Sequence, residues 1–413
     1  MSDVAVLPSS ARPRAPHPVV WTILYLPFGA LGGFVTVALT FLATRNGLSI
    51  TEGSLLNGAQ LLTAWLKWLW APLVDITLTP RRWYVIATVA SAAGVVAMSA
   101  IPLSPATLGH LLVVIAAASL INSMVGMSIE AIMAATTTKE EQGRVSAWFQ
   151  AGNLGGSGLG GGLGLLLLET LPAPWMSGTV LGVMFLLCCF ALLAVPAVEI
   201  PRHAGGAAAA VKGVIADLVA MVKTKGGFLS AFLCALPVGT GAAQGALTQA
   251  EVAAHWGAGS ADVGLLQGLL AGLITTAGCF GGGWLCSRFH PRTAYAVIGL
   301  LLAAVATLMA LAPATLVYYY VWNILYSFGV GLAYSAFTAV VLNSMGAGSA
   351  ATKYNLMASL SNFPIWWLGL LLGRVADVSG PNAMLLTEAG LGVVGVVVFA
   401  GVTRAVGRTK LAD

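Results

Sequence analysis

The chain has 413 residues, of which 58% are hydrophobic and only 8% are charged, and its net charge is +5. A soluble domain carries about 25% charged residues, so the composition excludes a soluble enzyme, a disordered chain and a nucleic-acid-binding domain. The mean hydropathy of +0.90 predicts that most of the chain lies within a membrane.

The first 18 residues are rich in Pro, Ala, Ser and Arg, and no apolar core precedes Val19. This pattern is not that of a secretory signal peptide, which needs an apolar stretch after its basic residues. We expect residues 1–18 to form a cytoplasmic tail.

Apolar runs of span length then follow one another along the chain, because a helix needs about 20 such residues to cross a bilayer. Six precede a polar stretch and six follow it, at 19–43, 53–74, 83–102, 108–133, 145–168, 175–198, 227–249, 262–285, 293–312, 315–344, 353–374 and 383–403. Ser49 and Glu52 form a predicted capping box before the second run. The sequence predicts an all-α membrane protein with twelve transmembrane helices in two six-helix bundles, 19–198 and 227–404, and a cytoplasmic tail at 405–413.

The polar stretch 199–226 contains AAAAVKGVIADLVAMVKTK, in which apolar residues recur at helical spacing among Lys212, Asp217 and Lys223. This spacing predicts an amphipathic helix on the cytoplasmic membrane surface that links the two bundles. The alternative is a linker without regular structure.

Basic residues gather in alternate loops, which sets the orientation of the helices. Sixteen of the 19 Lys and Arg residues fall on the side that holds both termini. The exceptions are Arg45 and Arg374, near the other face, and Lys67, within a span. By the positive-inside rule, we expect both termini in the cytoplasm of a bacterium and a multi-pass protein of its inner membrane.

The two bundles show signs of a common repeat. The loop TPRRWYVI after the second run matches HPRTAYAVI after the eighth, with one gap. Arg144 and Asn153 also match Lys353 and Asn362, both pairs being nine residues apart and offset by 209. Duplicated halves around a central cavity are a common transporter architecture, and the major facilitator fold is one example.

Three segments carry a more specific resemblance. They are LKWLWAPLVD (66–75), QGRVSAWFQAGNLGGSGLGGGLG (142–164) and ATKYNLMASLSN (351–362). They resemble the AmpG muropeptide permease and acetyl-CoA transporter group of the major facilitator superfamily, which includes siderophore permeases. The resemblance implies twelve helices, transport, and a proton gradient as energy source with no cofactor. The chain departs from the general facilitator loop, since Ile76 rather than Arg follows Asp75.

Two charged residues within spans are candidates for substrate binding or proton coupling. Lys67 lies about two turns inside the second span, on the same face as Gln60. A charge at this depth costs about 2.5–3.5 kcal/mol and needs a partner or water. Glu130 continues the stripe of Asn122 and Gly126 and is the predicted coupling acid. The alternatives are a structural ion pair or snorkelling for Lys67, and a structural contact with Arg144 for Glu130.

Polar residues at three- or four-residue spacing mark further helix faces that should look inward, because lipid offers them no partner. By family analogy the first, fourth, seventh and tenth helices line the pore. The expected lining residues are Tyr25, Asn122, Gln244, Tyr319, Asn323 and Tyr326. The alternative is hydrogen bonding between helices.

Four charged residues at the cytoplasmic rim are expected to act in gating, Asp75, Arg81, Arg144 and Arg288. The five cysteines lack Cys-x-x-Cys spacing, so the sequence predicts neither a metal site nor disulfides. No Walker motif is present, which excludes direct drive by nucleotide hydrolysis.

These observations predict a secondary active transporter, not an enzyme, that imports a small polar or amphiphilic solute with protons. The resemblance implies a siderophore or muropeptide. The expected partners are a small-molecule substrate and the lipid bilayer, with no nucleic acid, and the expected state is a monomer. The alternatives are an exporter of amphiphilic compounds, a receptor or assembly factor with the same fold, and an intramembrane enzyme, although no H-E-x-x-H or G-x-S-x-G occurs.

Overall fold

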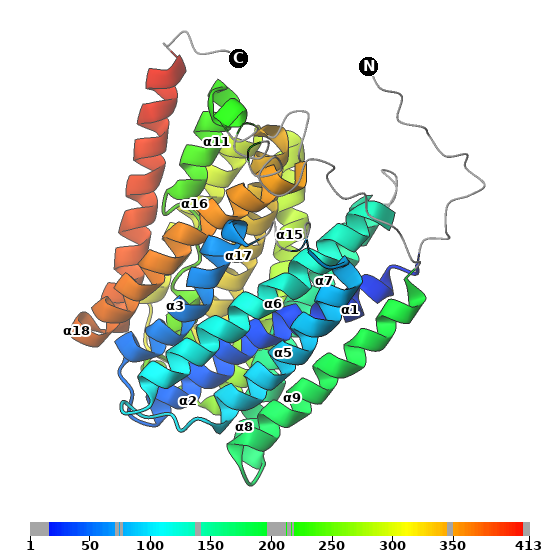
Figure 1. Cartoon of the computed structure of the whole chain (residues 1–413). Coiled ribbons are helices and arrows are strands. Elements are labelled where there is room, and N and C mark those ends of the chain that lie inside the picture. The colour runs from blue at the N-terminus through cyan, green and yellow to red at the C-terminus, as the bar shows by residue number, and fades with distance from the viewer. Residues whose placement is uncertain are drawn as a thin grey trace.

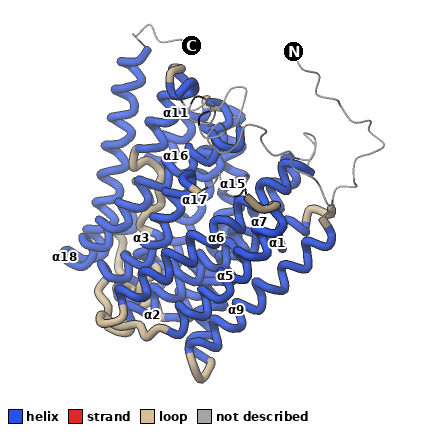
Figure 2. Tube along the Cα trace, viewed as in Figure 1, coloured by secondary structure: helices blue, strands red, loops and turns tan. Residues whose placement is uncertain are grey.

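The computed structural model of the chain describes residues 16–70, 74, 77–136, 142–195, 212, 216, 219–344 and 350–407. Within these ranges the regular elements are all helices (Figure 2). A helix satisfies its backbone hydrogen bonds internally, which is what an apolar chain requires in lipid. The all-α prediction is confirmed.

The first half of the chain forms six helical spans. The first is α1 (Val19–Gly33), η2 (Phe34–Leu39) and α2 (Thr40–Arg45), and the second is α3 (Ile50–Leu66) with η3 (Lys67–Leu69). The third and fourth are α5 (Pro80–Ala100) and α6 (Leu108–Thr136). The fifth is α7 (Gln142–Gly158), η4 (Leu159–Leu163) and α8 (Gly164–Thr170), and the sixth is α9 (Pro174–Cys188) with η5 (Cys189–Ala194).

The second half begins with a span that is broken. It consists of α11 (Lys225–Ala235), α12 (Gln244–Leu247) and α13 (Ala250–Ala254). The eighth span is α14 (Ser260–Val263), η6 (Gly264–Leu270) and α15 (Ala271–Arg288), followed by α16 (Pro291–Leu311) and α17 (Leu316–Ser344). The last element, α18 (Ala350–Gly407), is two spans joined at Gly380, whose φ of 84° is not helical. The predicted twelve spans are therefore present.

Eight described helical stretches are long and apolar enough to cross a membrane by length and composition. One of them, Asn355–Gly407, contains both spans of α18. The spans of α3, of α7 to α8 and of α11 to α13 complete the set. Most of the predicted amphipathic segment 199–226 lies outside the described residues, as do the tails 1–15 and 408–413.

Corresponding helices of the two halves begin in the same way, as the repeat predicts. Both α5 and α16 have 21 residues and start with proline in the first turn, where its missing N–H is harmless. Each carries a buried tyrosine four residues later, Tyr84 and Tyr295. Both α6 and α17 have 29 residues. The boundaries of the two bundles remain predictions.

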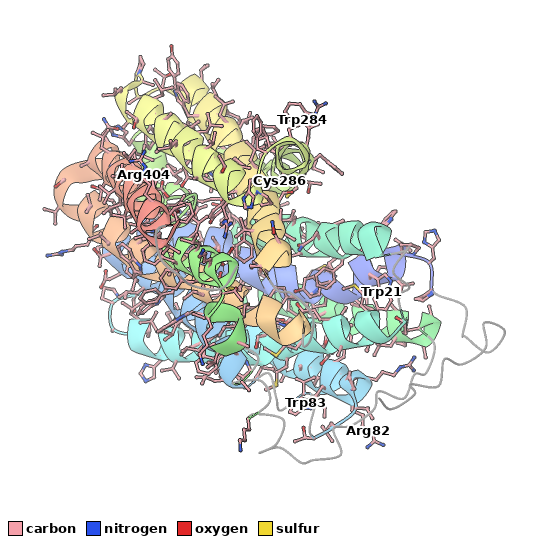
Figure 3. The ribbon with its side chains drawn as sticks, turned by 90° about the horizontal axis from the view of Figure 1, so that it is seen from above. Trp21, Arg82, Trp83, Trp284, Cys286 and Arg404 are labelled. Carbon is pink, nitrogen blue, oxygen red and sulfur yellow. The ribbon has the colours of Figure 1, made fainter. Side chains whose placement is uncertain are left out.

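The helices of the two halves meet at one end and diverge towards the other (Figure 1). We call the end at which α1 begins and α18 ends the terminal end, and the opposite end, near the α2–α3 turn, the closed end. The halves contact each other through α3 with α18, α7 with α15, and η4 with η6. Figure 3 views the terminal end, where exposed Arg82 and Arg404 lie on different halves.

Glycines allow the closest of these contacts. A Cβ added to Gly268 of η6 would lie 2.6 Å from Cα of Gly162 of η4, and one added to Gly272 would lie 2.8 Å from the Leu154 carbonyl oxygen. Backbones of opposite halves thus touch directly at this contact, in the way small residues permit in membrane helices.

Candidate functional site

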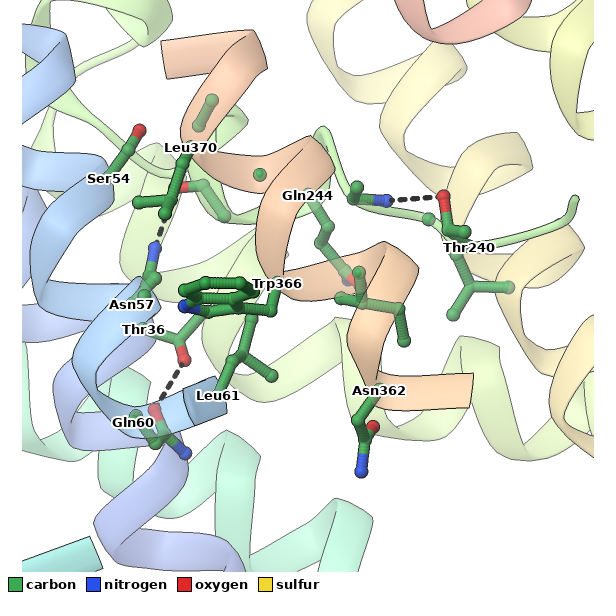
Figure 4. Close-up of a pocket in the computed structure, with 18 of the residues that line it drawn as sticks. Thr36, Ser54, Asn57, Gln60, Leu61, Thr240, Gln244, Asn362, Trp366 and Leu370 are labelled. Carbon is green, nitrogen blue, oxygen red and sulfur yellow. Dashed lines mark hydrogen bonds between the residues drawn. The ribbon is translucent and has the colours of Figure 1, made fainter. Parts of the chain in front are cut away.

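A polar cavity of about 180 Å³ lies between the two halves (Figure 4). The first half contributes η2 and α3, and the second contributes the break before α12, α12 itself, α17 and α18. The polar side chains in its lining are Thr36, Ser54, Asn57, Gln60, Thr240, Gln244, Tyr334, Asn362 and Trp366. Because both halves supply donors and acceptors, a bound solute would bridge them.

Amide groups face the cavity from both sides. Gln60 accepts a hydrogen bond from the Thr36 hydroxyl at 3.3 Å, and Asn362 donates to the Ala64 carbonyl at 3.4 Å. Asn57 donates through Nδ2 to the Gly245 carbonyl at 3.3 Å. Its Oδ1 is buried and makes no hydrogen bond with any described residue. A buried acceptor without a partner is costly, so Asn57 is a lining residue whose hydrogen-bonding capacity is not met in this state.

The Trp366 ring lines the cavity, and other aromatic rings pack against it. The Trp366 indole stacks on Trp65 with ring centroids 5.5 Å apart and an interplanar angle of 16°, and Trp65 also contacts Phe363 at 4.9 Å. Trp366 belongs to α18 and Trp65 to α3, so this cluster spans the two halves. Such a surface suits the flat face of a ring.

Hydrogen bonds between the halves seal the closed end of the cavity. Asp377 of α18 accepts from the backbone N–H groups of Ile50 and Thr51, each at 2.7 Å. Further hydrogen bonds join the first half to α13 and to the two residues that precede it. They are Thr248 Oγ1 to the Thr36 carbonyl at 2.8 Å, Gln249 to Ser54 at 3.0 Å, and the Ala250 N–H to Thr44 Oγ1 at 2.7 Å. We refer to these as the closing bonds.

Asp377 completes the cap of α3. The first helical N–H groups have no partner within the helix and carry its positive dipole end. Ser49 accepts from the Glu52 N–H, and Glu52 accepts from the Ser49 N–H, which confirms the predicted capping box. The two remaining N–H groups, of Ile50 and Thr51, are taken by a carboxylate from the opposite half.

The break in the seventh span positions the cavity wall. Pro237 and two glycines with left-handed backbones, Gly239 (φ 63°) and Gly241 (φ 62°), interrupt the helix between α11 and α12. Glycine is the residue that adopts this conformation without strain. The predicted continuous span 227–249 is wrong in this respect, although its proline and glycines were a visible signal.

Of the predicted substrate residues, Gln60 and Gln244 line the cavity, while Tyr25 and Asn122 pack within the first half. Asn122 donates to the Phe28 carbonyl at 3.0 Å, and the Tyr25 ring lies 3.8 Å from that of Phe149. These contacts agree with the alternative stated above, in which polar residues bond between helices and do not line the pore. Whether any of these residues takes part in transport stays a prediction.

Three predicted residues of α17 bond within the second half. Tyr319 donates to the Leu247 carbonyl at 2.8 Å, and Asn323 donates to the Tyr319 carbonyl at 2.8 Å and accepts from Gln267. Tyr326 contacts Glu388, a buried acid of α18. These side chains hold α17 to its neighbours behind the cavity wall.

Lys67 and Glu130 are both half-buried and do not form an ion pair with each other or with another described residue. Lys67 is the C-cap of α3, where a cation meets the negative end of the helix dipole. Their predicted roles in binding or coupling stay predictions.

Two of the predicted gating residues, Arg81 and Arg288, lie at the terminal end. Arg81 donates to the Val195 carbonyl of its own half, and the exposed Arg288 lies over the Trp284 ring of its own helix at 5.7 Å. Asp75 and the Arg144 side chain lie outside the described residues. The closing bonds, at the opposite end, were missed by the sequence analysis because they join residues 195 or more positions apart.

Comparisons with known proteins agree with this architecture. A family model described as Major Facilitator Superfamily matches residues 21–365. No curated protein sequence matches significantly. A solved structure of the nucleoside transporter NupG has a TM-score of 0.65 and 15% identity, covering 95% of this chain and 99% of that one. A NupG mutant has a TM-score of 0.66 and 14% identity, covering 93% and 99%.

At such identities the NupG structures show the fold alone, whereas the family model spans most of the chain. The AmpG-like group and the substrate are not decided by these matches. The chain belongs to the major facilitator superfamily and is a multi-pass membrane protein of the secondary transporter class.

Proposed function

We propose that the protein moves an uncharged, hydrogen-bonding solute with a planar ring by alternating access, inward across a bacterial inner membrane and with protons. The observation that carries the proposal is the cavity between the halves. Its described lining consists of amides, hydroxyls, an indole and apolar groups, with no Asp, Glu, Lys, Arg or His. An ionised solute would lose its hydration there without gaining an opposite charge.

A nucleoside has the required chemistry, with a planar base and several hydroxyl groups. The base fits against the Trp366 ring, and its polar edge and the sugar hydroxyls fit the amides of Gln60, Gln244 and Asn362. The similarity of fold to a nucleoside transporter agrees with this class. A muropeptide carries carboxylates and fits the described lining less well, so the siderophore or muropeptide class implied by the sequence resemblance is the competing outcome.

The orientation of the protein in the membrane is inferred from the charge of the loops, and inward transport is taken from the family resemblance of the sequence. The terminal end carries the predicted cytoplasmic cluster of basic residues, including Arg82 and Arg404 (Figure 3). With that end in the cytoplasm, the cavity is closed on the outside by the closing bonds and belongs to the inward-facing state of the transport cycle.

The test is uptake by the purified protein in liposomes. We expect saturable exchange of radiolabelled uridine for internal uridine, and accumulation when the outside is acidic. The matched control is uridine 5′-monophosphate, which differs by a charged phosphate and should not be transported. Transport of the monophosphate, of a ferric siderophore or of a muropeptide in place of uridine would overturn the proposed substrate class.

A further inference from the structure

The second half contains a buried acid that the cavity does not use. Glu388 of α18 is only 8% exposed. Its Oε1 accepts from the Ala243 N–H at 3.1 Å, and the Tyr326 hydroxyl oxygen lies 2.8 Å from Oε1 and 2.7 Å from Oε2. Ala243 is the last residue of the break in the seventh span, so the carboxyl group holds the point at which that helix resumes.

The charges around Glu388 do not compensate an ionised carboxylate. No described Lys, Arg or His forms an ion pair with it. The titratable groups on the elements packed against it are Tyr318, Tyr319, Tyr320, Tyr326 and Tyr334 on α17, Arg292 and Tyr295 on α16, Lys225 and Cys234 on α11, and the exposed Glu251 on α13 with His255 after it, while α12 has none. The two cations, Lys225 and Arg292, lie in the first turns of their helices, where Arg292 donates to the Gly226 carbonyl. The Tyr326 hydroxyl has one hydrogen and can donate it to only one carboxyl oxygen at a time. The other short contact becomes a hydrogen bond when Glu388 is protonated and donates to the Tyr326 oxygen.

The break in the seventh span connects Glu388 to the cavity wall and to the closing bonds. Thr240, Gly241 and Ala242 line the cavity, so the segment presents one face to the solute and the Ala243 N–H to Glu388. Beyond the break, α12 and α13 follow, with the Gly245 carbonyl bound to Asn57 and with Thr248, Gln249 and Ala250 in the closing bonds.

We propose that Glu388 is the binding site of the coupling proton. When Glu388 gains or loses this proton, the break in the seventh span shifts, and this shift alters the cavity wall and the closing bonds. This rests on the proposed function, since it deepens the coupling step. The carboxylate takes up one proton on the acidic side and returns it on the other, and no covalent bond other than O–H changes. Acids and broken helices within membrane proteins are common ion sites in transport.

The experiment compares Glu388→Gln with Glu130→Gln, which alters the acid predicted from the sequence. In liposomes, Glu388→Gln should keep uridine exchange within about twofold of the parent. It should lose accumulation driven by a pH gradient, a loss of ~tenfold for each pH unit applied if one proton moves per solute. If Glu388 alone carries the coupling proton, Glu130→Gln loses neither exchange nor pH-driven accumulation, contrary to the role predicted for Glu130 from the sequence. Accumulation by Glu388→Gln with the parent's pH dependence, or loss of accumulation only in Glu130→Gln, would overturn the proposal.

If the Glu388→Gln variant fails to fold, a second measurement on the parent protein tests the same proposal. Uridine binding to the detergent-purified parent should be pH-dependent and accompanied by the exchange of one proton with a weakly buffered solution. Tyr326→Phe keeps the acid but removes its hydroxyl partner, and it should shift the pH midpoint of that binding. An unchanged midpoint contradicts the inference. Absence of uridine exchange in the parent itself would instead refute the proposed function, so the two failures are distinguishable.

Discussion

Asn57 is the cavity residue with the clearest unmet hydrogen-bonding capacity. Its Nδ2 is used by the Gly245 carbonyl, and its Oδ1 is buried without a described partner. We expect Asn57→Leu to weaken uridine binding by about tenfold, since a hydrogen bond to a neutral group contributes about 0.5–1.5 kcal/mol. The measurement is the dissociation constant by titration calorimetry.

Asn323→Leu is the matched control for this change. Asn323 is also buried, but its amide is used by Tyr319 and Gln267 behind the cavity wall. This variant should lower the unfolding temperature while leaving the dissociation constant of the folded fraction unchanged. A loss of affinity in Asn323→Leu as large as in Asn57→Leu would place Asn323 in the substrate site, as predicted from the sequence.

Sequence reasoning identified polar helix faces but could not tell their two uses apart. Gln60 and Gln244 reach the cavity, whereas Tyr319 and Tyr326 bond to neighbouring helices. Both uses place polar side chains at three- or four-residue spacing along one helix face, because lipid offers these side chains no hydrogen-bond partner. The difference lies in the rotation of each helix about its axis, which depends on contacts distant in sequence.

The N-terminus of α3 is held by two caps that act differently. Glu52 bonds locally to Ser49, while Asp377 reaches across from the other half. We expect Asp377→Asn to weaken closure by about 1–2 kcal/mol, because the variant loses the charge that favours a helix N-terminus and one of its two acceptors. The population open at this end should rise about tenfold.

Labelling of one introduced cysteine, in a protein whose five native cysteines are replaced by alanine, measures that population. Thr248→Cys places a thiol among the closing bonds, where an impermeant maleimide reaches it only when this end is open. The control is Glu52→Gln, which alters the same helix terminus without touching the opposite half. Faster labelling with Asp377→Asn but not with Glu52→Gln is the expected result, and equal labelling rates in both would show that Asp377 acts only as a local cap.

Most helices could be predicted from the chain, because long apolar runs in lipid have few alternatives to a helix. The seventh span is the informative exception. Its apolar residues from 227 to 249 predict one helix, yet Pro237, Gly239 and Gly241 open it, and Glu388, 145 residues beyond Ala243, takes the N–H where it resumes. The residues that break the helix can be recognised in the sequence, but the sequence does not show that Glu388 accepts the N–H group at which the helix resumes.

Alternating access requires the closing bonds to separate in each cycle. Thr40 Oγ1 and Thr248 Oγ1 lie 3.2 Å apart on opposite halves, so cysteines at both positions should form a disulfide. We expect the oxidised double variant to bind uridine from the terminal end but to stop exchange across liposomes, and reduction to restore it.

A cross-link within one half provides the comparison. A Cβ added to Gly182 of α9 would lie 3.5 Å from the Ala92 Cβ of α5, and both belong to the first half. Replacing both with cysteine and oxidising them should leave exchange unaffected, since those helices move together. Continued exchange by the oxidised Thr40→Cys/Thr248→Cys protein would mean that the halves do not part at this contact during transport.

The contact between η4 and η6 has a mechanical consequence. Where Gly162 and Gly268 meet, backbone lies on backbone, because neither glycine has a side chain to place between the helices. Interlocked side-chain ridges have to disengage before helices can change their crossing angle, whereas backbones in direct contact can roll over each other. We therefore expect the halves to pivot at this contact, so that a small rotation there becomes a larger displacement at the distant ends of the helices.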